Sequence, residues 1–368
     1  SFTLDKGSFG HSHNKDLTTI QLSTMSSYLE KYSMSNKRLG EGGFGRVYLG
    51  RRRTDGISVA IKFVPFRMMR CIEVNGAMKP LEAVTLDMVA KDPPFPGIIR
   101  MLDYYMTQRG WLIVMEKPEN MQDFHDYITS RVCLDEDESR SFLRQVVRAL
   151  AHCHSCGVVH MDVKDENLLL DPFKHELKLI DFGSAVFLEP DKEYLIFRGT
   201  AVYGPPERLT QGRYKALPCE VWSLGILLYD MVHGDVPFQN DEAILEGKLH
   251  FKQDLSKDCV ALIQRCLSAS PEERPTLKDI LAHPWMSKQG SEGHECRSSA
   301  RPRTPTQGDT PGLEPGLTRT AEANGAVAPT GRESISAEEN TKLHCSSMLT
   351  RGSASLDESL PNTQQRTL

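Results

Sequence analysis

Acidic and amide side chains that could serve phosphoryl transfer lie close together in the middle of the sequence. Within His-Met-Asp-Val-Lys-Asp-Glu-Asn, residues 160–167, Asp162 could take the proton of an attacking hydroxyl group, and Lys164 could neutralise a transferring phosphoryl group. Asn167 and Asp181, which begins an Asp-Phe-Gly sequence, offer oxygen atoms to a metal ion such as Mg²⁺. A single Asp-Phe-Gly is most often only a turn, so the chemistry depends on the whole set and its order.

A glycine-rich segment near the start of the chain has the spacing of a phosphate-binding loop. Residues 40–47, Gly-Glu-Gly-Gly-Phe-Gly-Arg-Val, match G-x-G-x-x-G-x-V, in which glycines let backbone N–H groups approach phosphate oxygens. The pattern alone also occurs in structural hairpins and in dinucleotide-binding folds, which place it between a strand and a helix. The strand-like residues 47–49 that follow favour a hairpin that covers phosphates.

Lys62 stands out as a charged residue inside an apolar, strand-like run, Val-Ala-Ile-Lys-Phe-Val at residues 59–64. A buried charge without a partner is costly, so this lysine needs an acidic neighbour unless its side chain reaches the surface. Glu82 lies in the helical pattern expected over residues 81–89 and is the candidate partner. The position of Lys62 after the glycine-rich segment favours contact with phosphate.

The elements that must position these residues fall into two blocks. Strand-like runs with one helix dominate residues 32–115, and helical patterns dominate residues 122–286, so we predict an α+β fold with a small β lobe, a hinge at 116–121 and a larger helical lobe. Residues 1–31 show little periodicity, and residues 287–368 contain almost no large apolar side chains. Such segments bury too little apolar surface to offset the entropy of ordering, so both are expected to be disordered.

These motifs, in this order, resemble the protein kinase family from about residue 32 to residue 286. The resemblance implies the two-lobed protein kinase fold and transfer of the γ-phosphate of ATP, with Mg²⁺, to a protein hydroxyl group. It implies that Lys62 holds the α and β phosphates and pairs with Glu82, and that Asp162 is the catalytic base. Lys164 is the expected catalytic cation that neutralises the transferring phosphoryl group. The metal ligands are then Asn167 and Asp181, and the expected ATP-binding residues are Leu39, Gly40, Gly42, Gly43, Phe44, Gly45, Val47, Ala60, Lys62, Glu116, Asn167 and Asp181.

Two further features resemble serine/threonine kinases, and PIM kinases among them. Lys164 follows Asp162 by two residues, and Gly-Thr at 199–200 precedes Pro-Glu at 206–207, as in serine/threonine kinases. PIM-like sequences occur at residues 116–119, 153–158, 177–184, 221–232 and 283–286. Proline has no N–H group, so the PIM-like Pro118 in the hinge would leave adenine one hinge hydrogen bond, to the carbonyl group of Glu116. By the same resemblance, Glu207 should pair with Arg274.

Acidic residues beside the motifs have two possible meanings. Glu119, Asp123 and Asp126 would share a helix face if a helix began there. They could be a solvated acidic helix start, favoured by the helix dipole, or a binding surface for basic residues upstream of the target serine or threonine, as in PIM kinases. The expected substrate-binding residues are Glu119, Asp123, Asp126, Asp165, Glu166 and Thr200.

Two positions depart from the kinase pattern. Met161 stands where PIM and many other kinases have an arginine that pairs with a phosphate in the activation segment, and methionine cannot form such a pair. We therefore predict activity without phosphorylation of that segment. Glu220 stands where most kinases have aspartate, and the sequence does not tell how it holds the catalytic loop. Both departures leave a catalytically silent pseudokinase as an alternative; a small-molecule kinase of similar fold is less favoured, because residues 206–207 resemble the protein-directed form.

Composition limits the partners. The net charge of −5 gives no basic excess for nucleic acid, and the longest apolar run, residues 221–232, falls short of the about 20 apolar residues of a membrane helix. We expect a monomer that binds ATP and protein substrates, and the resemblance implies the cytoplasm and also the nucleus. Cys153 and Cys156 form a C-x-x-C that could bind zinc or do redox chemistry, or could simply lie at a helix end capped by Gly157.

Overall fold

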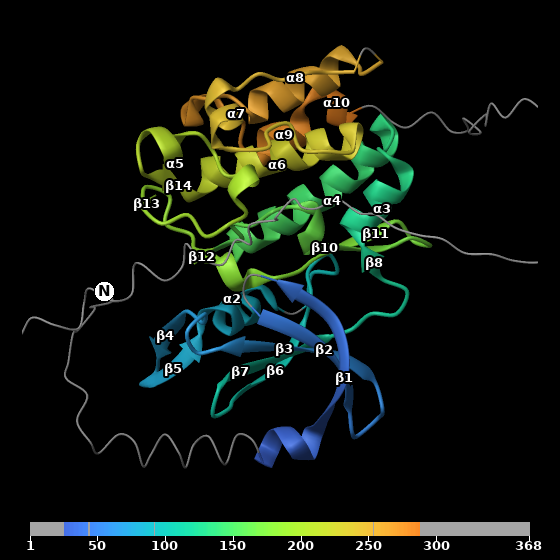
Figure 1. Cartoon of the computed structure of the whole chain (residues 1–368), viewed down its shortest axis with the longest axis vertical. Coiled ribbons are helices and arrows are strands. Elements are labelled where there is room, and N and C mark those ends of the chain that lie inside the picture. Colours follow the sequence, from blue (N-terminus) through green and yellow to red (C-terminus); the bar gives the residue numbers. More distant parts are fainter. Residues whose placement is uncertain (1–25, 43–44, 92, 253, 288–368) are drawn as a thin grey trace, which may run out of the picture. The chain divides into compact units, whose positions relative to one another are not determined.

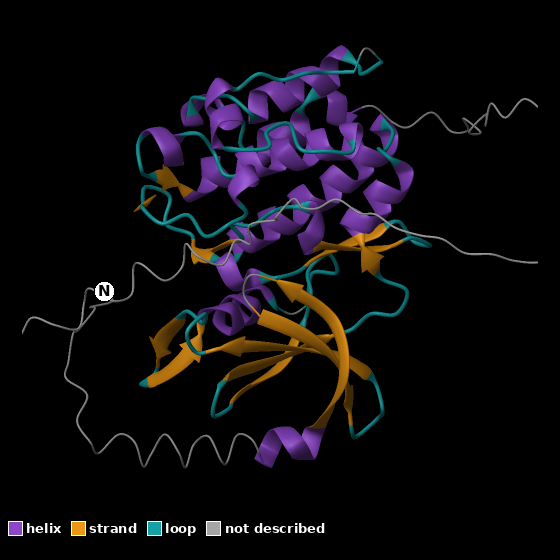
Figure 2. Cartoon of the chain, viewed as in Figure 1, coloured by secondary structure: helices purple, strands orange, loops and turns teal. Residues whose placement is uncertain are grey.

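The computed structural model describes residues 26–42, 45–91, 93–252 and 254–287. Strands gather in one lobe and helices in the other, as Figures 1 and 2 show. The predicted α+β, two-lobed architecture is therefore confirmed.

The small lobe is an antiparallel five-stranded sheet with the order β1-β2-β3-β7-β6. Its strands alternate side chains between two faces, so in β3 Val59 and Ile61 face the apolar interior of the lobe while Lys62 points to the opposite side. The sheet strands are β1 (Tyr32–Gly42), β2 (Gly45–Arg52), β3 (Ser58–Pro65), β6 (Met101–Met106) and β7 (Gly110–Glu116).

One hairpin and one helix complete the small lobe. The hairpin pairs β4 (Cys71–Val74) with β5 (Ala77–Pro80), and helix α2 (Leu81–Val89) follows at once, with Pro80 as its N-cap in a non-helical conformation (φ −58°, ψ 130°). The helix spans the predicted residues 81–89 and contains Glu82, which is buried.

The large lobe is built on two long helices. In α4 (Glu136–Ser155), Phe142, Val146 and Leu150 recur at helical spacing and are buried, and Asp135 caps the first turn by accepting the N–H of Glu138. Helix α6 (Ala216–His233) is apolar almost all round and is buried almost throughout, as its sequence predicts. The other helices are α3 (Phe124–Arg131), α5 (Glu207–Thr210), α7 (Asp241–Glu246), α8 (Lys257–Cys266), α9 (Leu277–Ala282) and α10 (Pro284–Ser287).

Short strands and 3₁₀ turns lie between these helices in the chain. The strands are β8 (Gln122–Asp123), β9 (Val158–Val159), β10 (Leu168–Asp171), β11 (Glu176–Leu179), β12 (Val186–Phe187), β13 (Glu193–Tyr194) and β14 (Tyr214–Lys215). The 3₁₀ turns are η1 (Asp165–Asn167), η2 (Phe182–Ser184), η3 (Ala201–Tyr203) and η4 (Pro271–Glu273). Figure 1 shows β8, β10, β11 and β12 on the side of the large lobe that faces the small lobe, and β13 and β14 beside α5. Two small sheets hold the loops that carry Asp162 and Asp181. One has the strand order β11-β10-β8, and the other pairs β12 with β9.

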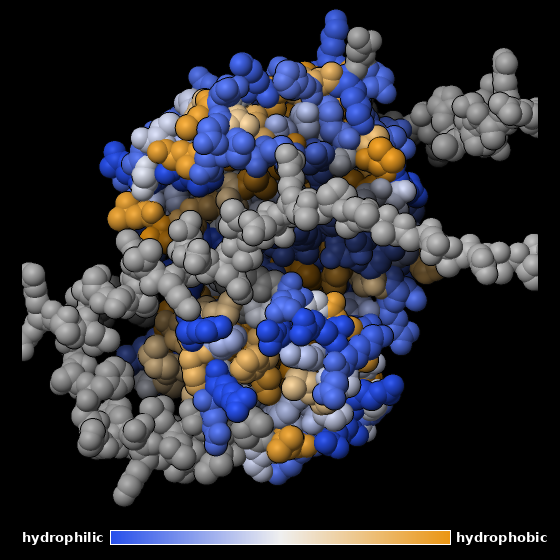
Figure 3. Space-filling view, in the orientation of Figure 1, coloured by the Kyte–Doolittle hydropathy of each residue, from blue (hydrophilic) through white to orange (hydrophobic). Residues whose placement is uncertain are grey.

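The main apolar core fills the large lobe and continues into α2 and β7. Trp222 and Trp285 are its largest buried side chains, at 1% and 0% exposure. Outside the grey atoms, mostly hydrophilic residues cover the face seen in Figure 3, with apolar residues in small groups. None of the helices among the described residues has the length and apolarity to cross a membrane.

The order of residues 26–31, which directly precede the predicted domain, was not foreseen from the sequence. Residues 26–31 form a helical turn, and Tyr28 is only 3% exposed because its ring packs against Tyr32 and Tyr105, at centroid distances of 6.2 and 5.4 Å. The pattern was missed because the turn is too short to show a helical period. At the other end, Ser287 closes α10, one residue beyond the predicted domain. The predictions of disorder for residues 1–25 and 288–368 lie outside the described residues.

Candidate active site

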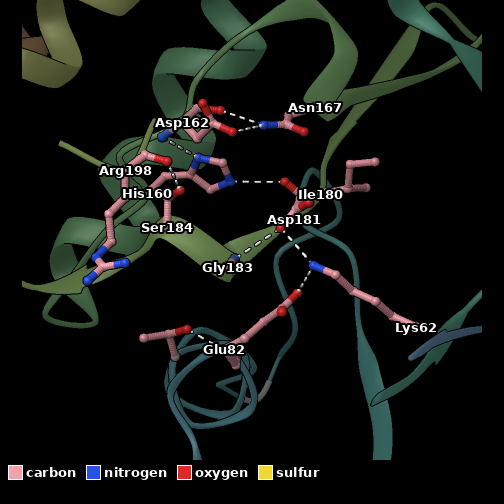
Figure 4. Close-up of polar contacts among 11 residues, drawn as sticks. Lys62, Glu82, His160, Asp162, Asn167, Ile180, Asp181, Gly183, Ser184 and Arg198 are labelled. Atoms are coloured by element: carbon pink, nitrogen blue, oxygen red, sulfur yellow. Dashed lines mark hydrogen bonds and ion pairs between the residues drawn. The ribbon is translucent and has the colours of Figure 1, made fainter. Parts of the chain in front are cut away.

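Lys62 joins the small lobe to the loop that carries Asp181. Its Nζ donates to Oε1 of Glu82 at 2.7 Å and to Oδ1 of Asp181 at 2.8 Å, and Figure 4 shows the ammonium group between the two carboxylates. The predicted pair of Lys62 and Glu82 is therefore confirmed, and α2 is held close to the active-site cleft.

The charged groups of Lys62, Glu82 and Asp181 shift one another's pKa values. Burial alone would lower the pKa of Lys62, but the carboxylates of Glu82 and Asp181 raise it above its usual value. Burial favours the neutral form of Asp181 as well, yet Lys62 and the N–H of Gly183 hold the pKa of Asp181 below its usual value. Burial raises the pKa of Glu82, against the effect of Lys62. An ammonium group and an ionised Asp181 carboxylate thus face the cleft together.

Asp162 is fixed from two sides on the catalytic loop. Its Oδ1 accepts the N–H of Thr200 at 2.8 Å and the hydroxyl of Thr200 at 3.0 Å. Its Oδ2 accepts the amide N–H of Asn167 at 2.9 Å, a contact that Figure 4 shows. The backbone N–H of Asp162 also donates to Nδ1 of His160, at 3.3 Å. Lys164 lies nearby in an ion pair with Glu166. The carboxylate therefore has a set orientation toward the cleft, as a proton acceptor needs.

A cavity of about 880 Å³ joins these groups. It brings together most of the residues predicted to form the site, namely Leu39, Gly40, Val47, Ala60, Lys62, Glu82, Glu116, Asp123, Asp162, Lys164, Glu166, Asn167, Asp181 and Thr200. Sequence reasoning missed the apolar side chains that line it, which are Ile99, Met115, Met121, Leu169 and Ile180, and also missed His125 and Arg198. The apolar ones carry no signal of their own, since core residues have the same types and spacing.

The glycine-rich segment forms the predicted hairpin of β1 and β2. Gly42 ends β1, whereas Gly43 and Phe44 lie outside the described residues. Gly45 does not line the cavity; its φ is +150°, and a Cβ there would lie 2.3 Å from the carbonyl oxygen of Phe63. Glycine is needed at this position because β2 lies close against β3.

The acidic residues do not share the helix face that the spacing predicted. Residues 122–123 first pair with β10 as β8, so α3 begins only at Phe124, and Asp123 is its cap, accepting the N–H of His125 at 2.9 Å. Glu119 lies before the helix and Asp126 in its first turn, and both are exposed away from the cavity lining. The condition for a shared helix face is not met for Glu119, because strand pairing delays the start of the helix.

Asp165 is buried and has two partners from other elements. Its Oδ1 accepts the hydroxyl of Tyr203 at 2.9 Å, and its Oδ2 lies 2.6 Å from Nδ1 of His125. The histidine is 52% exposed and the carboxylate 7%. A histidine between two aspartates in sequence was the available signal, but the partner lies forty residues away in the chain.

The structure shows how Glu220, which stands where most kinases have aspartate, contacts the catalytic loop. From α6, its Oε1 accepts the backbone N–H of His160 at 2.9 Å, and its Oε2 lies 2.6 Å from Nε2 of His154 in α4. Burial works against a charged His154, but the Glu220 carboxylate more than offsets this and raises the pKa of His154. The longer side chain therefore holds the catalytic loop and is itself held by a histidine.

Met161 belongs to an apolar cluster instead of a charged one. It is 5% exposed and packs with Val159, Val186 and Tyr214, and its φ is +68°. Arg70 of the small lobe donates to the carbonyl groups of Ser184 and Ala185, at 3.5 and 3.1 Å, just after the Asp-Phe-Gly turn. In Figure 4 the Arg198 side chain points away from Asp162.

Two further expectations concern structure more than chemistry. Arg274 donates from both terminal nitrogens to Glu207, at 2.8 and 2.7 Å, so the predicted pair is confirmed. Cys153 and Cys156 are buried in the core, and Gly157 follows with φ +78°, the conformation of a helix cap. Among the described residues, no three histidine, cysteine, aspartate or glutamate side chains are placed to hold a metal ion.

The side chains present suit Mg²⁺ and ATP. The amide nitrogen of Asn167 is engaged by Asp162, which leaves its carbonyl oxygen as the donor for a metal, and Asp181 supplies a carboxylate that lines the same cavity. Mg²⁺ prefers a few such oxygen ligands and keeps phosphate or water oxygens for the rest. The apolar end of the cavity, with Val47, Ala60 and Leu169, suits a flat aromatic base.

Known proteins agree with this geometry. The protein kinase domain family matches residues 33–286. Serine/threonine-protein kinase pim-2 of Danio rerio is 44% identical over 280 residues, which are 74% of this chain and 90% of that protein. Serine/threonine-protein kinase prk-2 of Caenorhabditis elegans is 39% identical over 256 residues, 68% of this chain and 57% of that protein. The PAS domain-containing serine/threonine-protein kinase of Mus musculus is 33% identical over 252 residues, 68% of this chain but 18% of its own length.

The similarity to these proteins thus lies in the kinase domain. For pim-2 of Danio rerio, the match covers 90% of that protein's length. Kinases of this family use ATP and Mg²⁺ to phosphorylate proteins. The chain belongs to the protein kinase family, and it is a PIM-like, ATP-dependent serine/threonine protein kinase.

Proposed function

We propose that the cleft transfers the γ-phosphoryl group of MgATP to serine or threonine in protein segments with basic residues before the acceptor, and that it does so without phosphorylation of the activation segment. The observation that carries the proposal is the fixed Asp162 carboxylate, held by Thr200 and Asn167 in the same cavity as Lys62 and Asp181. A scaffold without catalysis would not need these groups together.

In this reaction Asp162 receives the proton of the substrate hydroxyl group. The hydroxyl oxygen bonds to the γ-phosphorus while the bond from that phosphorus to the β–γ bridging oxygen breaks, which leaves ADP. Thr200 and Asn167 keep the carboxylate oriented through the hydrogen bonds described above. A positioned base of this kind typically contributes about 10²–10⁴-fold to the rate.

Positive charge would balance the phosphates. When bound, Mg²⁺ neutralises charge on the transferring group, and Asn167 and Asp181 are the proposed ligands. Lys62 would hold phosphate oxygens, with Glu82 keeping its ammonium group in place. Lys164 would stabilise the phosphoryl group during transfer. The glycine-rich hairpin would cover the phosphates from the small lobe.

The hinge would bind adenine by one hydrogen bond. Lys117 and Pro118 follow β7 and line the cavity. Because proline lacks an N–H group, the proposed bond runs to the carbonyl oxygen of Glu116. Apolar contact with Ala60 and Leu169 would supply the remaining binding energy.

Acidic side chains at the cleft support a preference for basic substrates. Asp123 and Glu166 line the cavity and Asp165 lies beside it, whereas Glu119 and Asp126 are exposed further out. Carboxylates attract arginine in a charge-assisted, often bidentate contact. All five are retained as proposed substrate-binding residues, with Thr200 next to Asp162.

Packing around Met161 supports activity without a phosphorylated activation segment. A phosphate would find no guanidinium at residue 161, whose place is taken by a methionine inside the apolar cluster of Val159, Val186 and Tyr214. Arg70 holds the carbonyl groups of Ser184 and Ala185, which ties the start of the segment to the small lobe. By analogy with PIM kinases, we also propose a monomer in the cytoplasm and nucleus.

The test is phosphate transfer from radiolabelled MgATP to an arginine-rich serine peptide, with protein made in bacteria. Transfer that disappears in Asp162→Asn and Asp181→Ala supports the proposal, and a signal that survives both variants contradicts it. An acidic peptide of equal length tests the basic preference, because equal rates on both would exclude it. Phosphatase treatment before the assay should leave the rate unchanged, and loss of activity would refute independence from phosphorylation.

A further inference from the structure

His125 places a basic side chain inside the acidic part of the cleft. It lines the cavity beside Asp123, and its Nδ1 lies 2.6 Å from Oδ2 of Asp165. Asp165 has one other side-chain partner among the described residues, the neutral hydroxyl of Tyr203. The histidine therefore occupies the open side of a nearly buried carboxylate.

The surroundings of this pair are strongly acidic. Asp123 caps the same helix, Glu166 follows Asp165 on η1, and Asp230 approaches from α6, close enough for Asp165 to raise its pKa. Lys164 is engaged by Glu166. The hydrogen bond to Asp165 raises the pKa of His125, helped by the charges of Asp165, Asp123 and Glu166 and opposed by partial burial. The charged groups that raise the pKa of His125 are thus all carboxylates, although Lys164 and Arg198 also line the cavity.

We propose that His125 is a specificity-determining residue that occupies the Asp165 carboxylate in place of a basic side chain of the substrate, so that a substrate arginine binds there by displacing it. The inference rests on the proposed preference for basic substrates. It explains how a carboxylate that is 7% exposed keeps a compensating partner before a substrate binds. Displacement is feasible because the imidazole is half exposed and can turn into solvent.

This exchange has a cost that depends on pH. A protonated His125 forms a charge-assisted pair with Asp165, which a substrate arginine must break. A neutral His125 binds Asp165 more weakly, so an arginine displaces it more easily. The raised pKa of His125 keeps it protonated to a higher pH than a free histidine. Basic peptides should therefore bind better as the pH rises through that pKa, and the change should be lost when residue 125 cannot titrate.

The experiment combines enzyme variants with peptide variants in the full chain. KM is measured for an arginine-rich serine peptide and for a series in which each arginine is replaced singly by alanine, with wild type, His125→Gln and His125→Lys, at about pH 6 and about pH 8.5. His175→Gln is the matched control, because His175 is 54% exposed and also faces a carboxylate, Glu138 at 3.7 Å, outside the cleft. Thermal unfolding of each variant checks that it folds.

For a half-exposed pair, the expected effect is about twofold to fivefold in KM. At the lower pH, His125→Gln should lower KM for the parent peptide. At the higher pH, where His125 is neutral and a lysine is still charged, His125→Lys should raise it. Both effects on KM should vanish for the peptide that lacks one particular arginine and should remain for the other peptides. A merely structural role of His125 would not produce this selectivity. For the wild-type enzyme, KM for the parent peptide should fall from the lower to the higher pH. For both variants, KM should change less between the two pH values.

The inference would be overturned if the His125 variants changed KM equally for all peptides, or if they changed KM no more than the His175→Gln control does. Either result would leave the proposed preference for basic substrates standing. A wild-type enzyme that shows no preference for arginine at any position would overturn the proposed substrate class, and this inference with it. The two failures are distinguishable because only the second is visible without any variant.

Discussion

One carboxylate, Glu220, holds two segments that must stay together for catalysis. Its two oxygens engage the N–H of His160 on the catalytic loop and the ring of His154 in α4, and its side chain is fully buried. We expect Glu220→Ala to lower kcat sharply and to destabilise the fold by about 1–3 kcal/mol, because it leaves a buried N–H group and a histidine unpaired.

The matched control is Glu220→Gln, which keeps the length and one acceptor oxygen. It should retain much of the activity and most of the stability. Both variants are compared by steady-state kinetics and by thermal unfolding. Equal loss in the two would show that the negative charge matters more than the hydrogen bond to His160.

Asp230 should make stability depend on pH. Burial and the nearby Asp165 raise the pKa of Asp230 to about 7, and its Oδ2 has no hydrogen-bond partner among the described residues. The folded protein then keeps this proton over a pH range in which the unfolded chain has lost it, so the free energy of unfolding falls as pH rises from about 4 to about 7.

Asp230→Asn removes this titration while keeping the shape. The variant should match wild type near pH 4 and be more stable by about 2–4 kcal/mol above pH 7, since each pKa unit corresponds to about 1.4 kcal/mol. Urea unfolding of both proteins across this range is the measurement. A constant difference between them at all pH values would contradict the raised pKa.

Sequence predicted the pairs that follow from motif order and missed those that do not. Lys62 with Glu82, and Glu207 with Arg274, were expected from their positions in the kinase pattern and are present. The partners of His125 and Glu220 could not be foreseen, because many carboxylates and histidines are available and only the folded chain selects among them.

At the scale of elements, long periodic segments were predictable and short ones were not. Helix α2 and strand β3 lie where the sequence placed them, and the long helix α4 lies in the block whose patterns were helical. The two-residue strand β8 was not foreseen, and it moved the start of α3 beyond Glu119. Such a strand carries no period, so its pairing with β10 depends on the tertiary fold.

The activation segment provides a prediction at this scale. Met161 packs in an apolar cluster that joins β9 and β12 to the start of α6, so Met161→Arg would bury a charge there with Arg70 and Arg198 already near the same pocket. We expect the free energy of unfolding to fall by about 1–3 kcal/mol, whereas Met161→Leu should stay within about 1.5 kcal/mol of wild type.

Thermal unfolding measures the change, and the peptide assay shows whether activity follows it. Higher activity of Met161→Arg after phosphorylation of the activation segment would mean that the ordinary arginine–phosphate arrangement can be restored. Unchanged stability would mean that the cluster does not exclude charge, against the packing described here.

At the scale of the whole domain, the two blocks of the sequence fold as the two lobes, and residues from both meet in one cavity. Lys62 and Glu82 come from the small lobe, while Asp162, Asn167 and Asp181 come from the large one. Sequence order predicted this division, because strands and helices differ in period. The helical turn at 26–31 could not be foreseen from the sequence, since only the burial of Tyr28 reveals that it belongs to the folded part.

That turn gives the prediction for the whole domain. A chain of residues 26–287 should keep the kcat, KM and stability of the full chain, because it contains every described residue and the whole family match. A chain of residues 32–287 loses Tyr28, which is 3% exposed and contacts Tyr32 and Tyr105, so it should lose about 3 kcal/mol. At about 2–4 °C per kcal/mol for a domain of this size, the expected drop in Tm is about 6–12 °C.

Two point variants of the full chain separate the contact from the truncation itself. Tyr28→Ala should reproduce most of the drop in Tm, whereas Leu29→Ala should leave it unchanged, because Leu29 is 56% exposed on the same turn. If Tyr28→Ala is neutral and the shorter chain is still less stable, the backbone of the turn supports β1 more than the tyrosine ring does. If the two truncated chains are equally stable, the domain begins at Tyr32, as its strand pattern predicts.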